Sequence, residues 1–535
     1  MIIESGIMAL IAPVVISVAT LVLMMQIAFW RNATVSWVIA CLSILVAMLV
    51  LIFPLTGGDG SAQQITPLLI ADSYSDFFSI LILFACLITS LLAKDYLQSR
   101  TGENEEFYLL LMLSGLGALI LVSSTHLASF LLGLELLGVA LYALIAYPER
   151  GHLPLEAAVK YLILSGAASA ILLFGFALIY AALGTLSFVD IGHRLAHSSD
   201  NQVLLLMGTA MIFAGIGFKL SLVPFHMWTP DVYQGAPSPV TGFLATVSKS
   251  AIFAALMRFY IDAQLYQYHR LLIGIAILAV ASMVIGNLLA LKQNNLKRLL
   301  AYSSIAHLGY LLITMVVYGR LQQPGIAVEA INFYLAAYVV TSLAAFALLT
   351  ILSSPSNANA AEGSISAAEG SSNTAEGSSN TAEGSTITAA EGSTITAEGS
   401  HLYLDAPEED HIDDVRGLFW RQPILALLLT ISMLSLAGIP LTVGFIGKFY
   451  LFTAGISAEL WVLLGALVIG SGIGIYYYLR VVFSMTAKVP EETSITANLK
   501  MSSVAMPVVW ILIVGMLYLG IFPQSFIEYL AGVVL

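Results

Sequence analysis

Long apolar runs, separated by short polar stretches, dominate the pattern of hydrophobic and polar positions along this chain. A helix that crosses the hydrocarbon core of a bilayer needs about 20 mostly apolar residues. Fourteen runs approach or exceed this length without alternating at a period of two, so they predict transmembrane helices and not barrel strands. Their approximate bounds are residues 7–30, 36–54, 76–93, 107–124, 127–147, 157–183, 203–223, 238–257, 271–291, 299–318, 327–352, 424–452, 460–486 and 504–522.

The composition favours the same class of protein. Of the 535 residues, 59% are hydrophobic and only 10% are charged, and the mean hydropathy is +0.93. Soluble domains carry about 25% charged residues, so these charges are too few to cover a soluble body of this size. A soluble enzyme, a disordered chain and a nucleic-acid binder are excluded. We expect an all-α polytopic protein in a lipid bilayer.

Lysine and arginine in the loops predict the orientation, because cytoplasmic loops carry an excess of both. With the N-terminus outside, twelve of the 20 Lys and Arg residues fall in inner loops, four in outer loops and four inside spans. The even number of spans then places both termini outside. The first span follows Glu4 and not a basic segment, so we expect a retained helix and not a signal peptide.

The formal net charge of −12 arises in one predicted cytoplasmic loop after the eleventh span. Between Ser354 and Asp414 there are twelve acidic residues and no Lys or Arg, and elsewhere the charges balance. Residues 361–400 repeat a seven-residue unit of the form AEGS-S/T-N/I-T. Gly and Ser in every copy, with no apolar heptad positions, favour a flexible, disordered linker over a coiled coil. An acidic binding segment is the alternative.

Lysines deep inside the spans are the candidates for chemistry. Each lysine at the centre of a transmembrane helix costs roughly 2.5–3.5 kcal/mol on insertion scales, so several of them indicate a function. A buried lysine, unlike an arginine, can release and regain a proton near neutral pH. The deep lysines are Lys219, Lys249 and Lys448.

Two of these lysines lie in spans that we expect to be broken. Pro224 follows Lys219 by five residues, while Gly438 and Pro440 precede Lys448. Backbone groups that such breaks free at membrane depth need protein or water partners, which predicts hydrated cavities. The two spans are the fourth members of spans 4–8 and 9–13. This layout predicts two inverted five-helix repeats, each with a broken helix.

Glu135 is the only acidic residue deep in a span, and Lys219 is its expected partner. Separating the pair would favour release of the lysine proton, and a purely structural pair is the alternative. His307 could connect Lys249 with Lys448, because a neutral imidazole both donates and accepts a hydrogen bond. Roles as satisfied interior groups are the alternatives for His307 and Lys249.

Other polar positions have simpler interpretations beside functional ones. His226 follows the break and could join the relay, cap the break or face an inner vestibule. Lys160 lies one turn after Glu156, so a surface ion pair explains it, with proton uptake as the alternative. Tyr476–Tyr478, next to Arg480, are interpreted as an interfacial aromatic belt. Motifs for metals, iron–sulfur clusters and nucleotides do not occur, so we expect no cofactor-binding or metal site on this chain.

The spans divide the chain into four predicted parts. Residues 1–106 hold the first three spans and residues 107–257 the first repeat. Residues 258–486 hold the second repeat, interrupted by the acidic loop 354–415, and residues 487–535 hold the last span.

Five segments carry a resemblance to a known family. They are EFYLLLM (Glu106–Met112), GLELL (Gly133–Leu137), PFHMWTPDVYQGAPSP (Pro224–Pro239), LKRLLAYSSIAHLGY (Leu296–Tyr310) and SLAGIPLTVGFIGKFY (Ser435–Tyr450). Over nearly its whole length the chain resembles the proton-translocating membrane subunits shared by respiratory complex I and the Mrp-type cation/proton antiporters.

Within this family the chain is most similar to the subunit N type. The segment Thr229–Pro237 reads TPDVYQGAP as in that type, and the twelfth span carries Lys448 where subunit M has a glutamate. The given sequence also ends soon after the fourteenth span, so we expect no long lateral helix of the subunit L type. The repeated AEGS tract departs from the family pattern, which has a short loop at this point.

The resemblance implies a function and roles for particular residues. Glu135, Lys219, Lys249, His307 and Lys448 would form a proton relay, driven by quinone reduction elsewhere in an NADH:quinone oxidoreductase. NADH, FMN, iron–sulfur clusters and quinone would be held by partner subunits, and neighbouring antiporter-like and small membrane subunits would be the partners. The location would be the inner membrane of a bacterium. A subunit of an Mrp-type Na⁺/H⁺ antiporter is the alternative.

Overall fold

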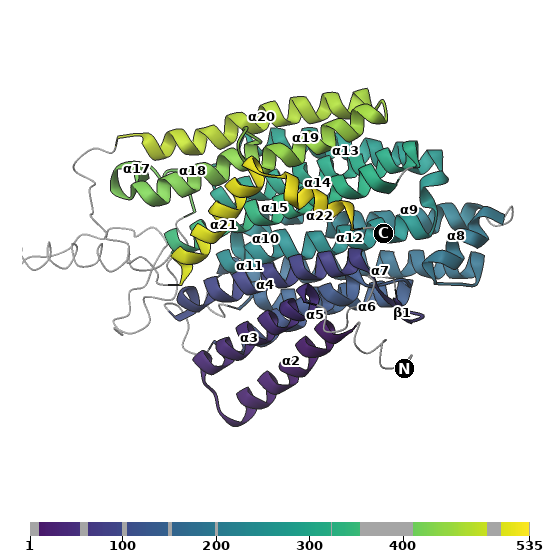
Figure 1. Ribbon diagram of the computed structural model, residues 1–535, viewed down its shortest axis with the longest axis horizontal. Coiled ribbons are helices and arrows are strands. Elements are labelled where there is room, and N and C mark those ends of the chain that lie inside the picture. The colour runs from purple at the N-terminus through teal and green to yellow at the C-terminus, as the bar shows by residue number, and fades with distance from the viewer. Residues whose placement is uncertain are drawn as a thin grey trace, which may run out of the picture.

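A computed structural model of the protein describes residues 10–53, 63–98, 104–147, 152–197, 202–322, 324–353, 410–488 and 504–533. The repeated tract and residues 354–409 of the acidic loop lie outside the described residues, whereas residues 410–415 are described and His411 forms a bridge with Asn295, which corrects the prediction of disorder at that end. Figure 1 shows a bundle of long helices that run in broadly similar directions. The molecule is therefore all-α in its main architecture, as predicted.

Twelve helices in the described parts of the chain are long and apolar enough to cross a membrane. A thirteenth span is counted when α21 and α22, which are bent by 83° at a short break, are taken together. This confirms a multi-pass helical membrane protein. The prediction of fourteen spans differs because residues 424–452 form two shorter apolar helices, α18 (Pro423–Ala437) and α19 (Val443–Ser457).

The first part of the chain contains three long helices and a small hairpin. Its elements are α2 (Ile11–Phe29), α3 (Ala33–Ile52), β1 (Gln63–Thr66), β2 (Leu69–Ala71) and α4 (Ser73–Gln98). The antiparallel hairpin pairs Gln63 with Ala71, and Leu69 also forms a bridge with Ser124. The apolar-run pattern did not predict this hairpin, because it is too short to leave a periodic signal.

The first set of five spans follows, with a break in its fourth member. Its elements are α5 (Glu105–Val122), α6 (Leu127–Ile145), α7 (His152–Leu183), α8 (Phe188–His197), α9 (Gln202–Lys219), α10 (Trp228–Gly235), α11 (Ser238–Phe243), η1 (Leu244–Ser248) and α12 (Lys249–Asp262). Helices α9 and α10 are the two halves of the broken span. Helix α11, the π-helical turn η1 and α12 together form the fifth span.

The second set has the same order, again with a break in the fourth member. Its elements are η2 (Leu265–Gln267), α13 (His269–Ala290), α14 (Leu296–Leu321), α15 (Pro324–Leu352), α17 (Leu418–Arg421), α18, α19 and α20 (Trp461–Thr486). The chain continues with α21 (Ala505–Ile521) and α22 (Gln524–Ala531). Both breaks occur where Pro and Gly were expected to end a helix. Inverted symmetry of the two sets remains a prediction.

The centre of the molecule is formed by the fifth span of the first set together with α14 and α15. The most apolar 18-residue stretch is completely buried in Ser238–Asp262 and in Leu296–Leu321, and 94% of it is buried in α15. In α2 and α3 only 28% of the corresponding stretch is buried. Polar residues on the central helices are thus shielded from lipid by protein on all sides.

Glycines bring α13 and α14 into close contact. A Cβ atom on Gly309 would lie 2.8 Å from the Met283 backbone nitrogen, and one on Gly286 would lie 2.9 Å from the Ala306 nitrogen. Neither distance is allowed, so only glycine permits this approach, as in many membrane helix pairs. The contact places polar side chains of α13 beside those of α14.

A buried ion pair joins the end of α12 to the start of α4. The Arg258 guanidinium donates to both oxygens of Asp72, at 2.7 and 2.8 Å. Tyr74 donates a 3.1 Å hydrogen bond to the Ala254 carbonyl beside it. Burial raises the pKa of the Asp72 carboxyl, but the bonds and charge of Arg258 outweigh this and hold that pKa below its ordinary value.

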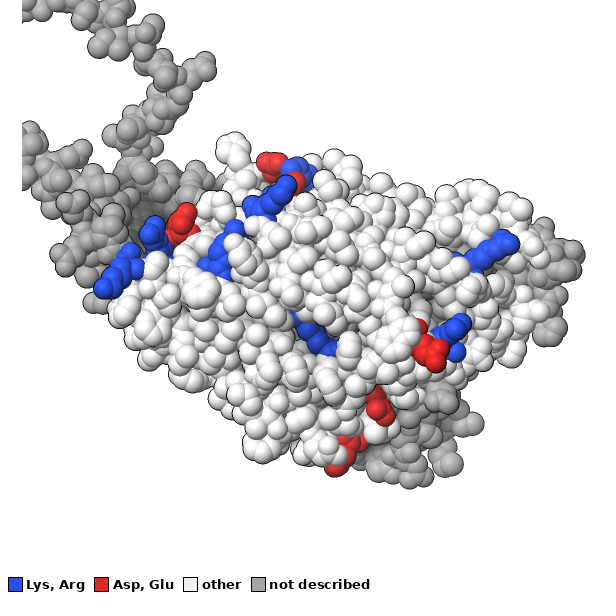
Figure 2. Space-filling view, turned by 90° about the horizontal axis from the view of Figure 1, so that it is seen from above, with Lys and Arg blue, Asp and Glu red and all other residues white. Residues whose placement is uncertain are grey.

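Charges are sparse on the surface. Figure 2 shows a face that is mostly free of Lys, Arg, Asp and Glu, with a few charged side chains scattered over it. Apolar side chains such as Val203, Val462 and Phe483 are each more than two-thirds exposed. An apolar surface of this kind is suited to lipid or to neighbouring membrane subunits.

Candidate functional site

Lys219 and Glu135 lie together in the first set. Lys219 is the last residue of α9, its side chain is 2% exposed, and its Nζ atom is 3.9 Å from Oε1 of Glu135. Two serines of α7, one turn apart, complete the contact. Lys219 Nζ donates to Ser165 Oγ at 2.6 Å, and Ser169 Oγ donates to Glu135 Oε1 at 2.5 Å.

The Glu135 side chain is 34% exposed, unlike that of its partner. Tyr142, two turns further along α6, donates a 2.8 Å hydrogen bond to Ser165 and so extends the polar contacts of Lys219. A carboxylate at membrane depth is costly against lipid, so the open side of Glu135 requires a protein or water partner. Sequence reasoning found the Glu–Lys pair but missed Ser165, Ser169 and Tyr142, which resemble ordinary helix residues.

The break after Lys219 is held by side chains from the following turn. The Trp228 indole donates to the Phe218 carbonyl at 2.9 Å, and Thr229 Oγ1 donates to Ser221 Oγ at 2.6 Å. Ser221 has a φ of +61°, which is uncommon for a residue other than glycine. The peptide bond between Val223 and Pro224 is cis. These contacts fix the backbone within two residues of Lys219.

His226 lies in this break but outside the polar contacts of Lys219. It is 6% exposed, and its ring centroid is 6.5 Å from that of Tyr302. Within the described chain neither ring nitrogen has a hydrogen-bond partner. The structure therefore does not bring His226 together with the other predicted relay residues.

Lys249 lies at the junction of the two sets. It is the first residue of α12, directly after the π-helical turn η1, and is 1% exposed. Its Nζ donates a 2.8 Å hydrogen bond to Ser304 Oγ on α14, and Ser304 is 2.7 Å from the Tyr338 hydroxyl on α15. The amine also lies 5.5 Å from the centre of the Tyr233 ring. π-Helical turns are frequent at functional sites, because they change the direction of one side chain.

His307 lies one turn beyond Ser304 on the same helix. Its Nδ1 atom is 2.7 Å from the Tyr334 hydroxyl, and its ring centroid is 5.4 Å from that of Tyr338. Lys249 and His307 thus belong to one buried cluster, through tyrosines of α15 that sequence reasoning did not single out.

Lys448 lies beside the break between α18 and α19. Its Nζ donates to the carbonyls of Leu436 and Ala437, at 3.0 and 2.8 Å, at the C-terminal end of α18. Gly438, at a φ of +83°, ends that helix, and a Cβ there would lie 2.8 Å from Lys448 Cδ. The carbonyls at a helix C-terminus carry partial negative charge, so they act as the counter-charge of the ammonium group.

A cavity lies between His307 and the α18–α19 break. It is lined by His307, Tyr338 and Thr341 on one side and by Ser435, Leu436 and Gly444 on the other, and has room for about one water molecule. Thr341 Oγ1 and Ser435 Oγ are 3.1 Å apart beside it. His307 lines this cavity, whereas Lys448 does not line it but donates to the carbonyl of Leu436, which does.

A second polar cluster corrects one expectation from the sequence. Tyr477 and Tyr478 are each 1% exposed, so the prediction of an interfacial belt is wrong for both, and for Tyr476, which is 65% exposed, it stays a prediction. Tyr477 donates to Asn287 Oδ1 at 3.1 Å, and Tyr478 is hydrogen-bonded to Ser303. The prediction was wrong because an aromatic run at a helix end looks alike whether it faces lipid or a neighbouring helix.

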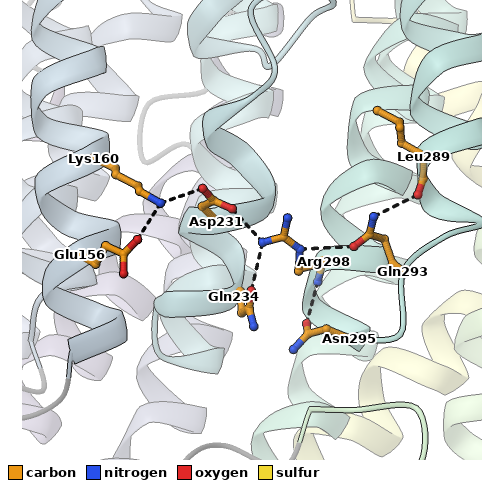
Figure 3. A network of polar contacts seen from close by, with 8 residues as sticks. All are labelled: Glu156, Lys160, Asp231, Gln234, Leu289, Gln293, Asn295 and Arg298. Carbon is orange, nitrogen blue, oxygen red and sulfur yellow. Dashed lines mark hydrogen bonds and ion pairs between the residues drawn. The ribbon is translucent and has the colours of Figure 1, made fainter.

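Further polar residues lie where α7, α10 and α14 meet (Figure 3). Lys160 pairs with Glu156 at 2.7 Å, as predicted, and also with Asp231 on α10 at 2.9 Å. Arg298 on α14 contacts the other oxygen of Asp231 at 2.7 Å. Among the described residues no group of three or more His, Cys, Asp or Glu could hold a metal ion.

This geometry defines a multi-pass membrane protein with three lysines buried inside its helical bundle. The profile of the NADH:quinone oxidoreductase/Mrp antiporter transmembrane family matches residues 124–365 and 392–474, which is more than half of the chain. The chain therefore belongs to this family of antiporter-like membrane subunits. Residues 366–391, which the match omits, lie within the repeated AEGS tract.

Solved structures have the same fold. A chain of respiratory complex I from Thermus thermophilus, in a structure with bound aureothin, is 30% identical, with 97% of this chain and 99% of that chain covered at a TM-score of 0.75. A chain of the archaeal membrane-bound sulfane sulfur reductase is 20% identical (98% and 96% covered, TM-score 0.76). A chain of the Mrp complex from Dietzia sp. is 18% identical (98% and 96% covered, TM-score 0.76).

Proposed function

We propose that this chain is the proton-translocating membrane subunit, of the subunit N type, of an NADH:quinone oxidoreductase in the inner membrane of a bacterium. The observation that carries the proposal is the placement of Lys219, Lys249 and Lys448. Each amine is at least nine-tenths buried and is hydrogen-bonded to groups on a neighbouring turn or helix. Three lysines kept at this cost in a membrane bundle are explained by proton transfer.

The relay would be controlled at Glu135. While the carboxylate is charged it stabilises the ammonium of Lys219 at 3.9 Å, and Ser169 holds it in place. If the carboxylate takes up a proton or moves away, Lys219 loses its counter-charge and its proton can pass onward. The exposed side of Glu135 is where a neighbouring membrane subunit would exert this control.

The middle of the relay would run through hydroxyl groups. Lys249 donates a hydrogen bond to the Ser304 hydroxyl, and that hydroxyl is hydrogen-bonded to the Tyr338 hydroxyl. Each hydroxyl can accept one proton while giving up another, so charge can move along the row without net displacement of atoms. His307, which is both donor and acceptor, and the cavity beside it would extend the path to the break in the second set.

The relay would end at Lys448. Its two carbonyl partners at the end of α18 stabilise the protonated amine without a carboxylate. Redox chemistry would take place on partner subunits that hold NADH, FMN, iron–sulfur clusters and quinone. Neighbouring antiporter-like and small membrane subunits would be the direct contacts of this chain. The complex I chain that is 30% identical over nearly the full length supports this assignment.

Substitution of the first pair tests the proposal. In inside-out membrane vesicles, Glu135→Ala and Lys219→Ala are expected to lower NADH-driven proton uptake and coupled quinone reduction, with the complex still assembled. Lys94→Ala is the matched control, because Lys94 lies over the Trp37 ring at 3.8 Å near the end of α4, away from the relay. Wild-type coupled activity in both relay variants would overturn the proposal.

A subunit of an Mrp-type Na⁺/H⁺ antiporter is the second candidate. It is favoured by the family profile, which covers both kinds of complex. Affinity purification of the tagged chain separates the two. Co-purification with NADH-oxidising subunits supports the first function, while an NADH-independent exchange of Na⁺ for protons supports the second.

A further inference from the structure

Asp231 is held by one helix from each set. On its first-set side, Lys160 Nζ on α7 lies 2.9 Å from Oδ2. On its second-set side, Arg298 Nη1 on α14 lies 2.7 Å from Oδ1 (Figure 3). Each carboxylate oxygen thus has its own cation. Helix α10, which is half of the broken span, lies between two cations that belong to different parts of the bundle.

The first turn of α14 holds α10 at further points. Arg298 also donates to Gln234 Oε1 at 3.0 Å, and the neighbouring Lys297 donates to the Ala236 carbonyl at 2.9 Å. Ala236 is the C-cap of α10, where a cation is favoured by the partial negative charge of the helix end. Arg298 is itself oriented by Gln293 at 3.3 Å. Helix α10 is therefore fixed to the second set along its side and at its end.

The other end of α10 leads directly to the turn around Lys219. Trp228, its first residue, bonds the Phe218 carbonyl, and Thr229 bonds Ser221. A non-glycine residue at positive φ, such as Ser221, persists only where its surroundings hold it. A shift of α10 would release both contacts and so move the backbone that carries Lys219.

We infer that Asp231 and Arg298 form a latch between the two sets of helices, which positions Lys219 from the second set. Both are positioning residues, since neither contacts a relay group. The inference rests on the proposed function, because Lys219 must be a relay residue for its position to matter. Helix α14 also carries Ser304 and His307. Helix α14 therefore both holds α10, next to the break after Lys219, and carries the next residues of the proposed relay.

The stability of the pairs does not explain this arrangement. The Lys160, Asp231 and Arg298 side chains are 41%, 37% and 27% exposed, and ion pairs of that exposure contribute little to folding. Their geometry, with one carboxylate shared between two helices and α10 bound at three points, is what restricts movement. The contacts of the latch thus favour one position of α10, yet their pairs are weak enough to separate.

The test compares carboxylates of the same network in the assembled complex. Asp231→Asn and Arg298→Gln are expected to lower protons pumped per NADH by about two- to fivefold, the range expected for one partly exposed contact. They should also shift the pH profile of pumping, because the surroundings of Lys219 change. Glu156→Gln is the matched control, because it removes a carboxylate from Lys160 without touching α10. The double variant D231R/R298D restores an opposite-charge pair but places a cation beside Lys160, so it is expected to recover pumping only in part.

Wild-type pumping and pH profile in both single variants would overturn the latch, and so would an equal effect of Glu156→Gln. If the single variants assemble poorly, Asp231→Glu keeps the charge but lengthens the side chain. A shifted profile in that variant supports the latch, and an unshifted one overturns it. Lys219→Ala, measured in parallel, separates the two hypotheses. If it pumps normally the proposed function fails, whereas loss of pumping with neutral latch variants removes the latch alone.

Discussion

Lys249 Nζ and Ser304 Oγ are 2.8 Å apart, and this hydrogen bond joins the fifth span of the first set to the second helix of the second set. Ser304 Oγ is in turn 2.7 Å from the hydroxyl of Tyr338 on α15. The two sets thus meet through an amine and two hydroxyls at the most deeply buried part of the bundle. Alanine in place of Ser304 and phenylalanine in place of Tyr338 would pack equally well, so packing alone does not explain the two hydroxyls.

Replacing Tyr338 with phenylalanine removes the hydroxyl and keeps the ring. We expect proton pumping to fall roughly three- to tenfold, the worth of one hydrogen bond of about 1 kcal/mol. Pumping per NADH in vesicles is the measurement. Tyr260→Phe is the control, because it removes an equally buried hydroxyl that bonds the Met315 carbonyl at 2.9 Å. Equal losses in the two variants would argue against a special role for Tyr338.

Replacing Gly438 with alanine tests the position of Lys448 without removing a titratable group. The new Cβ would lie 2.8 Å from Lys448 Cδ, and the φ of +83° is strained for alanine. We expect a stability loss of about 1 kcal/mol or more and a marked fall in pumping. Gly465→Ala on α20, where a Cβ meets nothing within 4 Å, is expected to be neutral. Normal pumping by Gly438→Ala would show that the lysine tolerates displacement.

Deleting Ala245 from the π-helical turn should convert it to α-helix. Each residue of an α-helix turns the chain by about 100°, so Lys249 would no longer face Ser304 unless α11 rotated instead. We expect pumping to fall to the level of Lys249→Ala. Combining the two changes should cause no further loss. Assembly is monitored by native gel electrophoresis, and retained pumping by the deletion variant in assembled complex would contradict the role given to this turn.

Arg258 and Asp72 should matter for stability and not for proton movement. Removing one partner of a buried pair costs about 3–5 kcal/mol, so Arg258→Gln is expected to lower the unfolding temperature of the complex. Arg270→Gln is the control, because Arg270 lies shortly after α12 in the chain and is exposed.

The pH dependence of this pair follows from the lowered pKa of Asp72. A carboxyl whose pKa is lower in the folded state contributes fully above its ordinary value of about 4, and the contribution is lost as the pH falls through the lowered pKa. The part of the difference between wild type and Arg258→Gln that comes from Asp72 should therefore be constant from pH 5 to 8 and narrow only in acid, as measured by thermal unfolding. A difference that changes near neutrality would show that another group is responsible.

The helices and their breaks could be predicted because they depend on continuous segments. An apolar run of sufficient length defines a span wherever its neighbours lie, Gly438 ends α18 at a positive φ, and Pro224 lies within the break that follows α9. The partnership of Glu135 with Lys219 was predictable for a similar reason. One deep carboxylate has few cations to choose from.

Lys249, His307 and Lys448 were also predicted, but their serine and tyrosine partners could not be, because the roles of those partners depend on helix rotation and packing. Ser165 and Ser304 are ordinary membrane-helix residues until a lysine from another helix faces them. Tyr477 and Tyr478 were misassigned because only the contact with Asn287 and Ser303 shows which side of α20 is inside. The π-helical turn before Lys249 leaves no mark in a local apolar pattern.

The two terminal lysines differ in what neutralises them. Lys219 faces a carboxylate, which can itself gain a proton, whereas Lys448 is held by the Leu436 and Ala437 carbonyls and has no carboxylate partner among the described residues. Protonation can remove the negative charge of a carboxylate, but it cannot remove the dipole of the backbone carbonyls. Under the proposed function the relay would therefore be asymmetric, with a counter-charge that can change at Glu135 and a constant one beside Lys448. A driving signal could then change the counter-charge of Lys219, through Glu135, but not that of Lys448.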